Sequence, residues 1–262
     1  MKKNIFVLTS LMLTLGCGCD SFLDETNYSD VTSEGGYYDT EAGLNAVVNA
    51  CYTPLRFWAG KEDAIGLSET GTDIIAAGSG CVDNNMAAYT QSLDGTNSAC
   101  TFYFDRFYAA INWCNTAIFH AQTVPNPSND EILATTLNKR EAEARVLRTF
   151  YYWILTETFG DTYYTDQPST SIVMNPVKTS TDNIYQYMFD DLDWAIKSKL
   201  STLQNDGGRV TIWTAKALKA RLLLTRASEK NDVDMYGQAY DLAKDVIENG
   251  PFELAEDFAS IW

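Results

Sequence analysis

Histidine and basic residues are scarce in this sequence, and the two shortages exclude several classes of function. The 262 residues include one histidine, His120, so a Ser-His-Asp catalytic arrangement or a histidine-rich metal site has little to be built from. Only 19 lysine and arginine residues stand against 35 aspartate and glutamate residues, which gives a formal net charge of −16. Such a surface repels nucleic acid phosphates and anionic headgroups, but it does not exclude neutral ligands such as sugars.

Motifs for phosphate, calcium and hydrolytic chemistry are also missing or incomplete. No glycine-rich phosphate loop is present. The stretch from Asp232 to Gly237 begins like a calcium loop, but Ala243 stands where a bidentate glutamate is required. Carboxylate pairs could hydrolyse glycosides, yet among 35 acidic residues pairs arise by chance, and Asp190-Asp191-x-Asp193 is expected to be a solvated helix face. We predict a protein that is not an enzyme and that has no metal or cofactor.

The N-terminus has the parts of an export signal. Lys2 and Lys3 precede the apolar run IFVLTSLMLTLG (residues 5–16), which is too short to span a bilayer. Gly16-Cys17-Gly18-Cys19 follows, and a cysteine after a small residue is typical of a bacterial lipoprotein signal. A metal or redox pair and ordinary secretion are the alternatives, although no second closely spaced Cys or His pair is available to complete a tetrahedral metal site.

Four cysteines remain after residue 19. Cys51 and Cys114 lie in helical patterns and are expected to be small core residues. Cys81 and Cys100 bracket a polar loop and could form a disulfide outside the cytoplasm. Closing a loop of about 20 residues would add on the order of 3 kcal/mol of stability.

The rest of the sequence predicts an all-α fold, a tetratricopeptide-like array of paired helices with long loops. Helical periodicity and capping residues place the helices, after an extended segment over residues 19–38, at 41–58, 101–124, 130–160, 183–200, 211–230 and 236–250. Thr40 is a predicted N-cap, Asn129 or Asp130 and Ser180 or Thr181 are the candidate N-caps of two later helices, and Gly160 is a predicted C-cap. Four tryptophans within the helical stripes are expected in the core: Trp113, Trp153, Trp194 and Trp213.

Residues 59–101 are rich in Gly, Ser, Asn, Thr and Asp, and a loop of this length is usually functional or disordered. Sugar binding needs aromatic faces for pyranose rings and polar side chains for hydroxyl groups. The candidate ligand-binding residues in and beside this loop are Trp58, Asp73, Asn84, Asn85 and Tyr89. The alternative is that they are solvated loop residues.

Several segments, in the same order along the chain, resemble the SusD/RagB family of outer-membrane nutrient-binding lipoproteins. They are Cys19-Asp20-Ser21-Phe22-Leu23-Asp24, the helix from Glu41 to Tyr52, Arg145-x-x-Arg148-Thr149-Phe150-Tyr151-Tyr152, Phe159-Gly160-Asp161, Ile184-Tyr185 with Asp190-Asp191-Leu192, and Gly208-Arg209-Val210. The first segment favours Cys19 over Cys17 as the lipidated residue, and Glu69-x-x-x-Asp73 is similar to a family segment near the ligand region. The family commonly has a proline after the Phe-Gly-Asp turn, where this sequence has Thr162.

The resemblance implies a lipoprotein signal peptide over residues 1–18, a lipidated cysteine and tether over 19–38, and a SusD-like helical domain over 39–262. Family members are about twice this long, so the domain is expected to be the N-terminal half, truncated at its C-terminus. The implied function is capture of a glycan at the cell surface and its delivery to a SusC-like TonB-dependent transporter in the outer membrane. A helical-repeat scaffold that binds another protein, and a glycoside hydrolase, are the alternatives.

Overall fold

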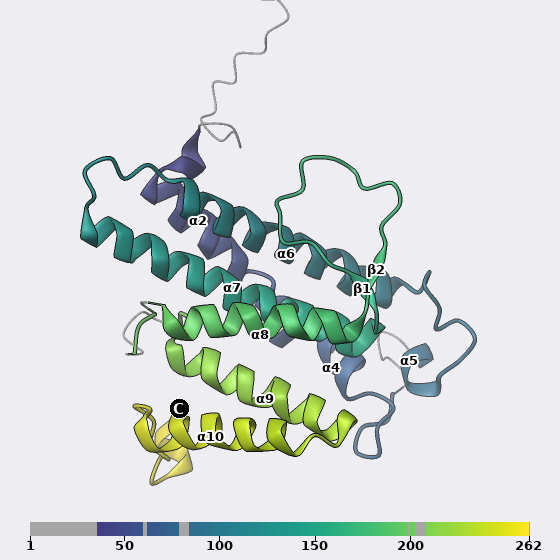
Figure 1. Cartoon of the computed structure of the whole chain (residues 1–262). Helices are drawn as coiled ribbons and strands as arrows, with labels where there is room; N and C mark the ends of the chain where they lie inside the picture. Colours follow the sequence, from purple (N-terminus) through teal and green to yellow (C-terminus); the bar gives the residue numbers. More distant parts are fainter. Residues whose placement is uncertain (1–35, 60–61, 79–83, 199, 203–207, 262) are drawn as a thin grey trace, which may run out of the picture. The chain divides into compact units, whose positions relative to one another are not determined.

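The computed structural model describes residues 36–59, 62–78, 84–198, 200–202 and 208–261 (Figure 1). The chain divides into two units, residues 1–37 and 38–262, and every helix and strand from α2 onward lies in the second. The predicted signal peptide, lipidation site and most of the tether therefore fall outside the described residues. Among the described helices, none combines the length and apolar character needed to cross a membrane.

The second unit is an array of helices in which each long helix packs on the next. The long helices are α6 (Ser98–Thr123), α7 (Glu131–Phe159), α8 (Thr181–Lys197), α9 (Ile212–Lys230) and α10 (Val233–Asn249). Figure 1 shows them running in alternating directions, and α2 (Glu41–Tyr52) packs on both α6 and α7. The predicted all-α array is confirmed.

Shorter elements connect and flank these helices. They are the 3-10 helices η2 (Tyr37–Asp39) and η3 (Phe258–Ile261) and the helices α3 (Leu55–Ala59), α4 (Glu62–Ser68) and α5 (Asn84–Ala88). The strands β1 (Thr162–Tyr163) and β2 (Lys178–Thr179) form a small antiparallel ladder that the sequence did not predict, with Thr162 opposite Thr179. The ladder forms after the Phe-Gly-Asp turn, where Gly160 has φ +69°, as expected of a C-terminal cap.

The predicted helix caps are confirmed. The Thr40 hydroxyl accepts a hydrogen bond from the Gly43 amide (3.0 Å), and the Asp130 carboxylate accepts from the Ile132 amide (2.8 Å). The Ser180 hydroxyl begins α8 in the same way. Each such cap contributes about 1 kcal/mol by satisfying amides that have no partner in the first turn.

Several predicted boundaries were wrong because of local backbone chemistry. Helix α10 begins at Val233 instead of Tyr236, because the Asp232 carboxylate accepts from the Asp234 and Met235 amides, and α8 ends at Lys197 instead of Leu200. The first helix ends at Tyr52 instead of continuing to Trp58, because Pro54 has no amide to donate. The loop predicted over 59–101 contains α4 and α5, and α6 begins at Ser98, where the Asn97 side chain accepts from two amides of the first turn.

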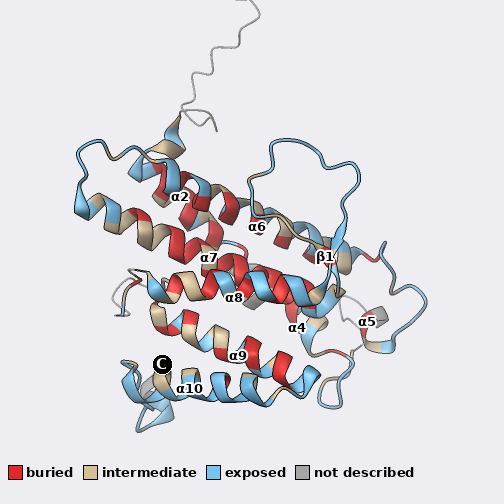
Figure 2. Cartoon of the chain, in the orientation of Figure 1, coloured by how far each residue is buried: buried red, intermediate tan, exposed pale blue. Residues whose placement is uncertain are grey.

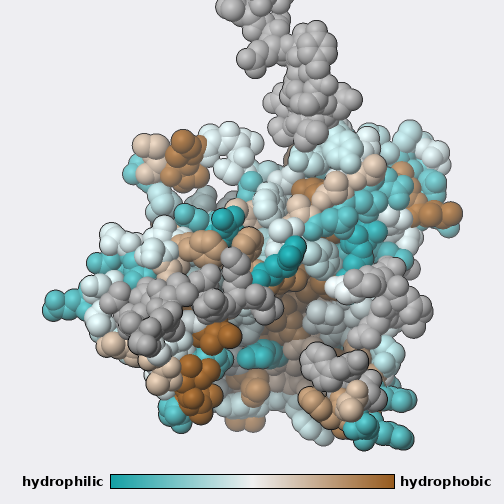
Figure 3. Space-filling model, turned by 180° about the vertical axis from the view of Figure 1, so that it is seen from behind, coloured by the Kyte–Doolittle hydropathy of each residue, from teal (hydrophilic) through white to brown (hydrophobic). Residues whose placement is uncertain are grey.

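The core lies where α2, α6, α7 and α8 face one another, and Figure 2 shows the buried residues concentrated on these helices. Cys51 and Cys114 are fully buried within it, as predicted. Burial, with the neighbouring Cys51, raises the pKa of the Cys114 thiol well above its usual value. In the space-filling view of Figure 3, hydrophobic side chains form separate groups among hydrophilic ones.

The tryptophan prediction holds only in part. Trp213 is buried and Trp153 and Trp194 are half-buried, but Trp113 is 38% exposed. The buried face of α6 runs through Ala110, Cys114 and neighbouring positions, and the spacing of 3.6 residues per turn leaves Trp113 off it.

Candidate functional site

A buried network of ion pairs joins helices α7 and α8. Asp191 on α8 accepts hydrogen bonds from Nε and a terminal nitrogen of Arg148 on α7, both at 2.8 Å, and a third from Arg145 at 2.6 Å. Arg148 is only 3% exposed. The expectation of a solvated face was therefore wrong for Asp191, because the partner arginines lie on a different helix and sequence spacing cannot show the pairing.

The same network anchors the segment that follows β1. Arg148 donates to the side-chain oxygen of Asn115 (2.8 Å). The side-chain nitrogen of Asn115 in turn donates to the backbone carbonyl oxygens of Thr165 (3.1 Å) and Gln167 (3.0 Å). The Tyr152 hydroxyl also bonds to both backbone groups of Thr165. The base of the β1–β2 connection is therefore held by side chains from α6 and α7.

A second network holds the start of α9 against α2 and α7. The buried Glu143 carboxylate accepts from the Tyr52 hydroxyl (2.6 Å), Arg140 (2.5 Å) and Arg209 (2.7 Å). The Val210 amide donates to the Tyr52 hydroxyl (3.0 Å). Burial, followed by the charge of Glu143, raises the pKa of Tyr52 well above its usual value. These charges are matched by partners, which is what a structural role requires.

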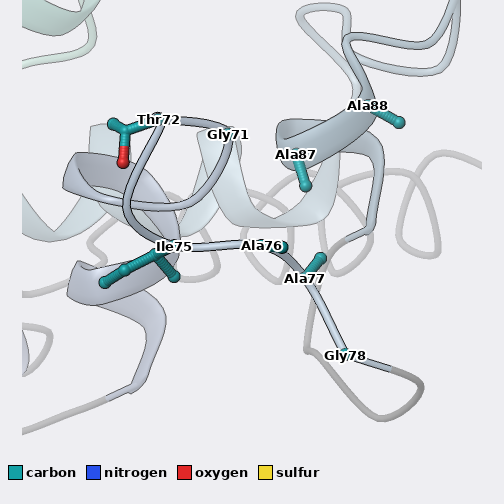
Figure 4. A pocket seen from close by; sticks show the side chains of 8 residues that line it. All are labelled: Gly71, Thr72, Ile75, Ala76, Ala77, Gly78, Ala87 and Ala88. Carbon is teal, nitrogen blue, oxygen red and sulfur yellow. The ribbon is translucent and has the colours of Figure 1, made fainter.

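A cavity of about 530 Å³ lies between the turn after α4 and helix α5 (Figure 4). Its volume falls in the range of roughly 300–1,000 Å³ that small-ligand sites occupy. Within the turn, the Thr72 hydroxyl donates to the Glu69 carbonyl (2.7 Å) and the Gly71 amide to the Ile75 carbonyl (3.2 Å). Apart from one isoleucine the walls consist of small residues, and the lining is, in order, Gly71, Thr72, Ile75, Ala76, Ala77, Gly78, Ala87 and Ala88.

Tyr89 stands beside this cavity in an unusual conformation. Its φ is +48° and its side chain is 74% exposed. A bulky residue in the left-handed region is strained, and such strain clusters at functional sites. Gly71 has φ +89°, and a Cβ there would come within 3.3 Å of both a Tyr89 ring carbon and the Ala87 carbonyl oxygen. The ring therefore rests on Gly71, and it presents an accessible aromatic surface.

The structure brings some of the predicted ligand residues together and separates others. Glu69 and Asp73 lie in the turn that borders the cavity, with Asp73 exposed and Glu69 half-buried, and the Tyr89 ring lies beside Gly71 of the same turn. Trp58 lies apart in α3, where its half-buried ring meets the core rings of Tyr103 (centroids 6.4 Å apart) and Phe107 (6.0 Å) edge-on.

Other predictions in this region concern residues that the structure does not describe fully. Asn84 and Asn85 begin α5, but their side chains lie outside the described part of the chain. Cys81 is also outside it, so the disulfide with Cys100 stays a prediction.

Sequence reasoning missed the small residues of the cavity wall. The signal for them was the run Ala76-Ala77-Gly78, whose short side chains leave space, together with Gly71 at a turn. Among the described residues, no group of three His, Cys, Asp or Glu side chains is placed to hold a metal ion.

The structure is thus an array of packed helices with an exposed tyrosine ring beside a loop-lined cavity. The family model described as "Starch-binding associating with outer membrane" matches residues 72–261. The chain belongs to this SusD-like family, which is a non-catalytic binding family.

Relatives and solved structures agree with this assignment. A SusD-like protein of Bacteroides ovatus is 26% identical over all of this chain and 47% of its own length, and SusD-like protein P2 of Formosa agariphila is 26% identical over 86% of this chain and 44% of its own. This chain thus spans about half the length of these curated relatives.

Solved structures show the shared fold. A SusD homolog from Bacteroides thetaiotaomicron has a TM-score of 0.73 at 22% identity, covering 86% of this chain and 44% of that one. A structure with a xylogluco-oligosaccharide (TM-score 0.65, 22% identity) covers 83% of this chain and 42% of that one. A laminarin-binding SusD-like protein (TM-score 0.62, 20% identity) covers 84% of this chain and 47% of that one.

Proposed function

We propose that this protein binds a neutral oligosaccharide or polysaccharide at the cavity beside Tyr89, and that it does so without catalysing a reaction. The observation that carries the proposal is the exposed Tyr89 ring, held in a left-handed conformation against Gly71. The net charge of −16 favours neutral over anionic glycans. Support comes from the structural relatives named for a xylogluco-oligosaccharide and for laminarin.

The chemistry of the site suits a sugar ring. The apolar face of a pyranose can stack on the Tyr89 ring, which contributes contact area at little cost in side-chain entropy. The Asp73 carboxylate, exposed on the turn, can accept hydrogen bonds from hydroxyl groups. The small residues of the wall leave room for the ring and expose backbone amides and carbonyls to it.

Affinity electrophoresis of the purified protein tests this proposal. Gels would contain starch, laminarin, xyloglucan or the anionic polygalacturonate, and retardation by at least one neutral glycan is expected. Tyr89→Ala should weaken binding about tenfold, as loss of an aromatic anchor usually does. Tyr240→Ala on α10, at a tyrosine that is 64% exposed, is the matched control and should bind like wild type.

Failure of every neutral glycan to retard the wild-type protein would contradict the proposal. It would then favour the protein-interaction scaffold. Release of reducing sugar by the purified protein would instead favour a glycoside hydrolase.

We further propose that a lipid on Cys19 holds the protein on the outer membrane. The lipoprotein-like signal supports this proposal, and the family's description includes association with the outer membrane. Several acyl chains on one cysteine would hold the protein firmly, whereas one chain binds only reversibly. Cys19→Ala should move the protein from the membrane fraction to the soluble fraction, whereas Cys17→Ala should not. Acylation at Cys17 would overturn the assignment.

The proposed role at the membrane is delivery of the captured glycan to a SusC-like TonB-dependent transporter. The likeness of the sequence to SusD/RagB proteins supports this partnership. Co-purification of a TonB-dependent transporter with the tagged protein from solubilised outer membranes would support it. Recovery of the protein free of any such transporter after mild cross-linking would contradict it.

A further inference from the structure

A second cavity, of about 440 Å³, lies at the base of the β1–β2 ladder. Figure 1 shows the ladder at the end of the array where α6 begins and α7 ends. Aromatic and charged side chains from α6, α7, the turn after α7 and the two strands line this cavity. They are Phe104, Asp105, Phe159, Asp161, Tyr163 and Lys178. None of these residues lines the cavity beside Tyr89.

The aromatic walls of this cavity are accessible and fixed. Phe104 is 39% exposed and lies on the solvent-facing side of α6, whose opposite side packs in the core. Its ring meets Phe159 edge-on at 5.5 Å and lies 4.6 Å from the Tyr108 ring. The Tyr108 hydroxyl donates to the Tyr163 carbonyl (2.5 Å), so strand β1 is tied to α6. These contacts hold a flat apolar surface in place at the mouth of the cavity.

Charged groups border the aromatic surface. One oxygen of Asp161 accepts from the Thr181 amide (2.8 Å) and hydroxyl (2.9 Å), which fixes the carboxylate. The hydrogen bond from the Thr181 amide, and next in size the one from the Thr181 hydroxyl, lower the pKa of Asp161. The Asp161 carboxyl group is therefore ionised at neutral pH. Asp105 and Lys178, both exposed, complete the border. Two acceptors and one donor thus surround an aromatic face.

We infer that this cavity is a second contact site for a neutral pyranose chain, an inference that rests on the proposed glycan-binding function. Sugar hydroxyls can donate to the carboxylates and accept from Lys178, while the ring stacks on Phe104. A uronate would meet two carboxylates against one lysine, so anionic sugars are disfavoured.

The second site is close enough to the first for one glycan chain to reach both. Ala88 lines the cavity beside Tyr89 and Gly95 lines the cavity at the ladder. Seven residue steps separate them, and an extended backbone spans at most about 3.6 Å per step, or roughly 25 Å. A polysaccharide that touches both sites gains affinity because the second contact becomes intramolecular.

Calorimetric titration of the purified full chain tests the inference. The probes are laminarin, starch and xyloglucan, with polygalacturonate as the anionic comparison. Phe104→Leu keeps apolar volume but removes the flat face, and Asp105→Ala removes an exposed carboxylate. Phe119→Leu, at a residue on the same helix that is 44% exposed and does not line the cavity, is the control. Circular dichroism would establish that each variant is folded.

The expected result is about tenfold weaker binding of a neutral polysaccharide by Phe104→Leu and by Asp105→Ala, with the control unchanged. The double variant with Tyr89→Ala should bind more weakly than either single variant. Wild-type binding that neither cavity variant alters would overturn the inference and leave the proposed function standing. No binding by wild type would overturn both, and preference for polygalacturonate would overturn the ligand class.

Discussion

Removal of the Asp191 carboxylate should be among the most destabilising single changes in this protein. Asp191 is buried and accepts from Arg148 at 2.8 Å twice and from Arg145 at 2.6 Å. In Asp191→Ala, Arg148 would remain buried with only neutral partners, the Asn115 side chain and, at 3.4 Å, the Asp166 carbonyl. Breaking a buried pair by removing one partner lowers the free energy of unfolding by about 3–5 kcal/mol.

Removal of both charges should be far milder. Replacement of a buried ion pair by apolar residues of similar volume is often neutral or stabilising. We therefore expect Arg148→Met/Asp191→Leu to be more stable than Asp191→Ala. The control is Asp193→Ala on the same helix, which breaks a more exposed 2.5 Å pair with Lys219 and should change stability by less than about 1 kcal/mol.

Equilibrium unfolding in urea, followed by far-ultraviolet circular dichroism, measures the wild type, these three variants and the single variants Arg148→Met and Asp191→Leu. Stability differences are taken from the transition midpoints, provided that the dependence on urea concentration keeps the same slope. Equal losses in Asp191→Ala and Asp193→Ala would refute the argument from buried charge. A double variant that is as unstable as the sum of its single changes would refute the pairing of Arg148 with Asp191.

Three further predictions concern backbone strain and ionisation. Gly71→Ala should lower stability by more than about 1 kcal/mol, because φ is +89° at this residue and the added Cβ would crowd Tyr89. The control is Gly66→Ala, where an added Cβ would meet no other atom within 4 Å and should cause no such loss. Thermal melts of the two variants compare their stabilities. The hydrogen bonds from Thr181 lower the pKa of Asp161, so the Asp161 carboxylate should stabilise the folded protein above pH ~3.9. Asp161→Asn should therefore be less stable than wild type above that pH, and the difference should disappear as the pH falls through the pKa of Asp161 in the folded protein. Urea titrations at several pH values measure this difference. Burial raises the pKa of Tyr52, Tyr151, Tyr152 and Tyr185, so stability should decline above pH ~10. In a spectrophotometric titration, part of the tyrosinate absorbance should rise only together with loss of helical dichroism, and a rise that is complete before unfolding would contradict the burial of these phenols.

The candidate site was predictable as a region and only partly by residue. The polar, glycine-rich composition of residues 59–101 pointed to the segment that forms the cavity beside Tyr89. The aromatic content made Trp58 and Tyr89 look equivalent, but Trp58 packs edge-on against core rings while Tyr89 stands in solvent. The second cavity was not predictable, because its walls come from segments more than 50 residues apart in the sequence.

The sequence by itself determined the helices and most of their ends, since Thr40, Asp130, Ser180 and Gly160 act on backbone groups within a few residues of themselves. Local chemistry of this kind is fully written in a short stretch of residues. Only the tertiary structure decided that Asp191 is buried between arginines of another helix. It also decided that the backbone of Tyr89 is left-handed, with its ring on Gly71, because these features depend on which segments meet in space.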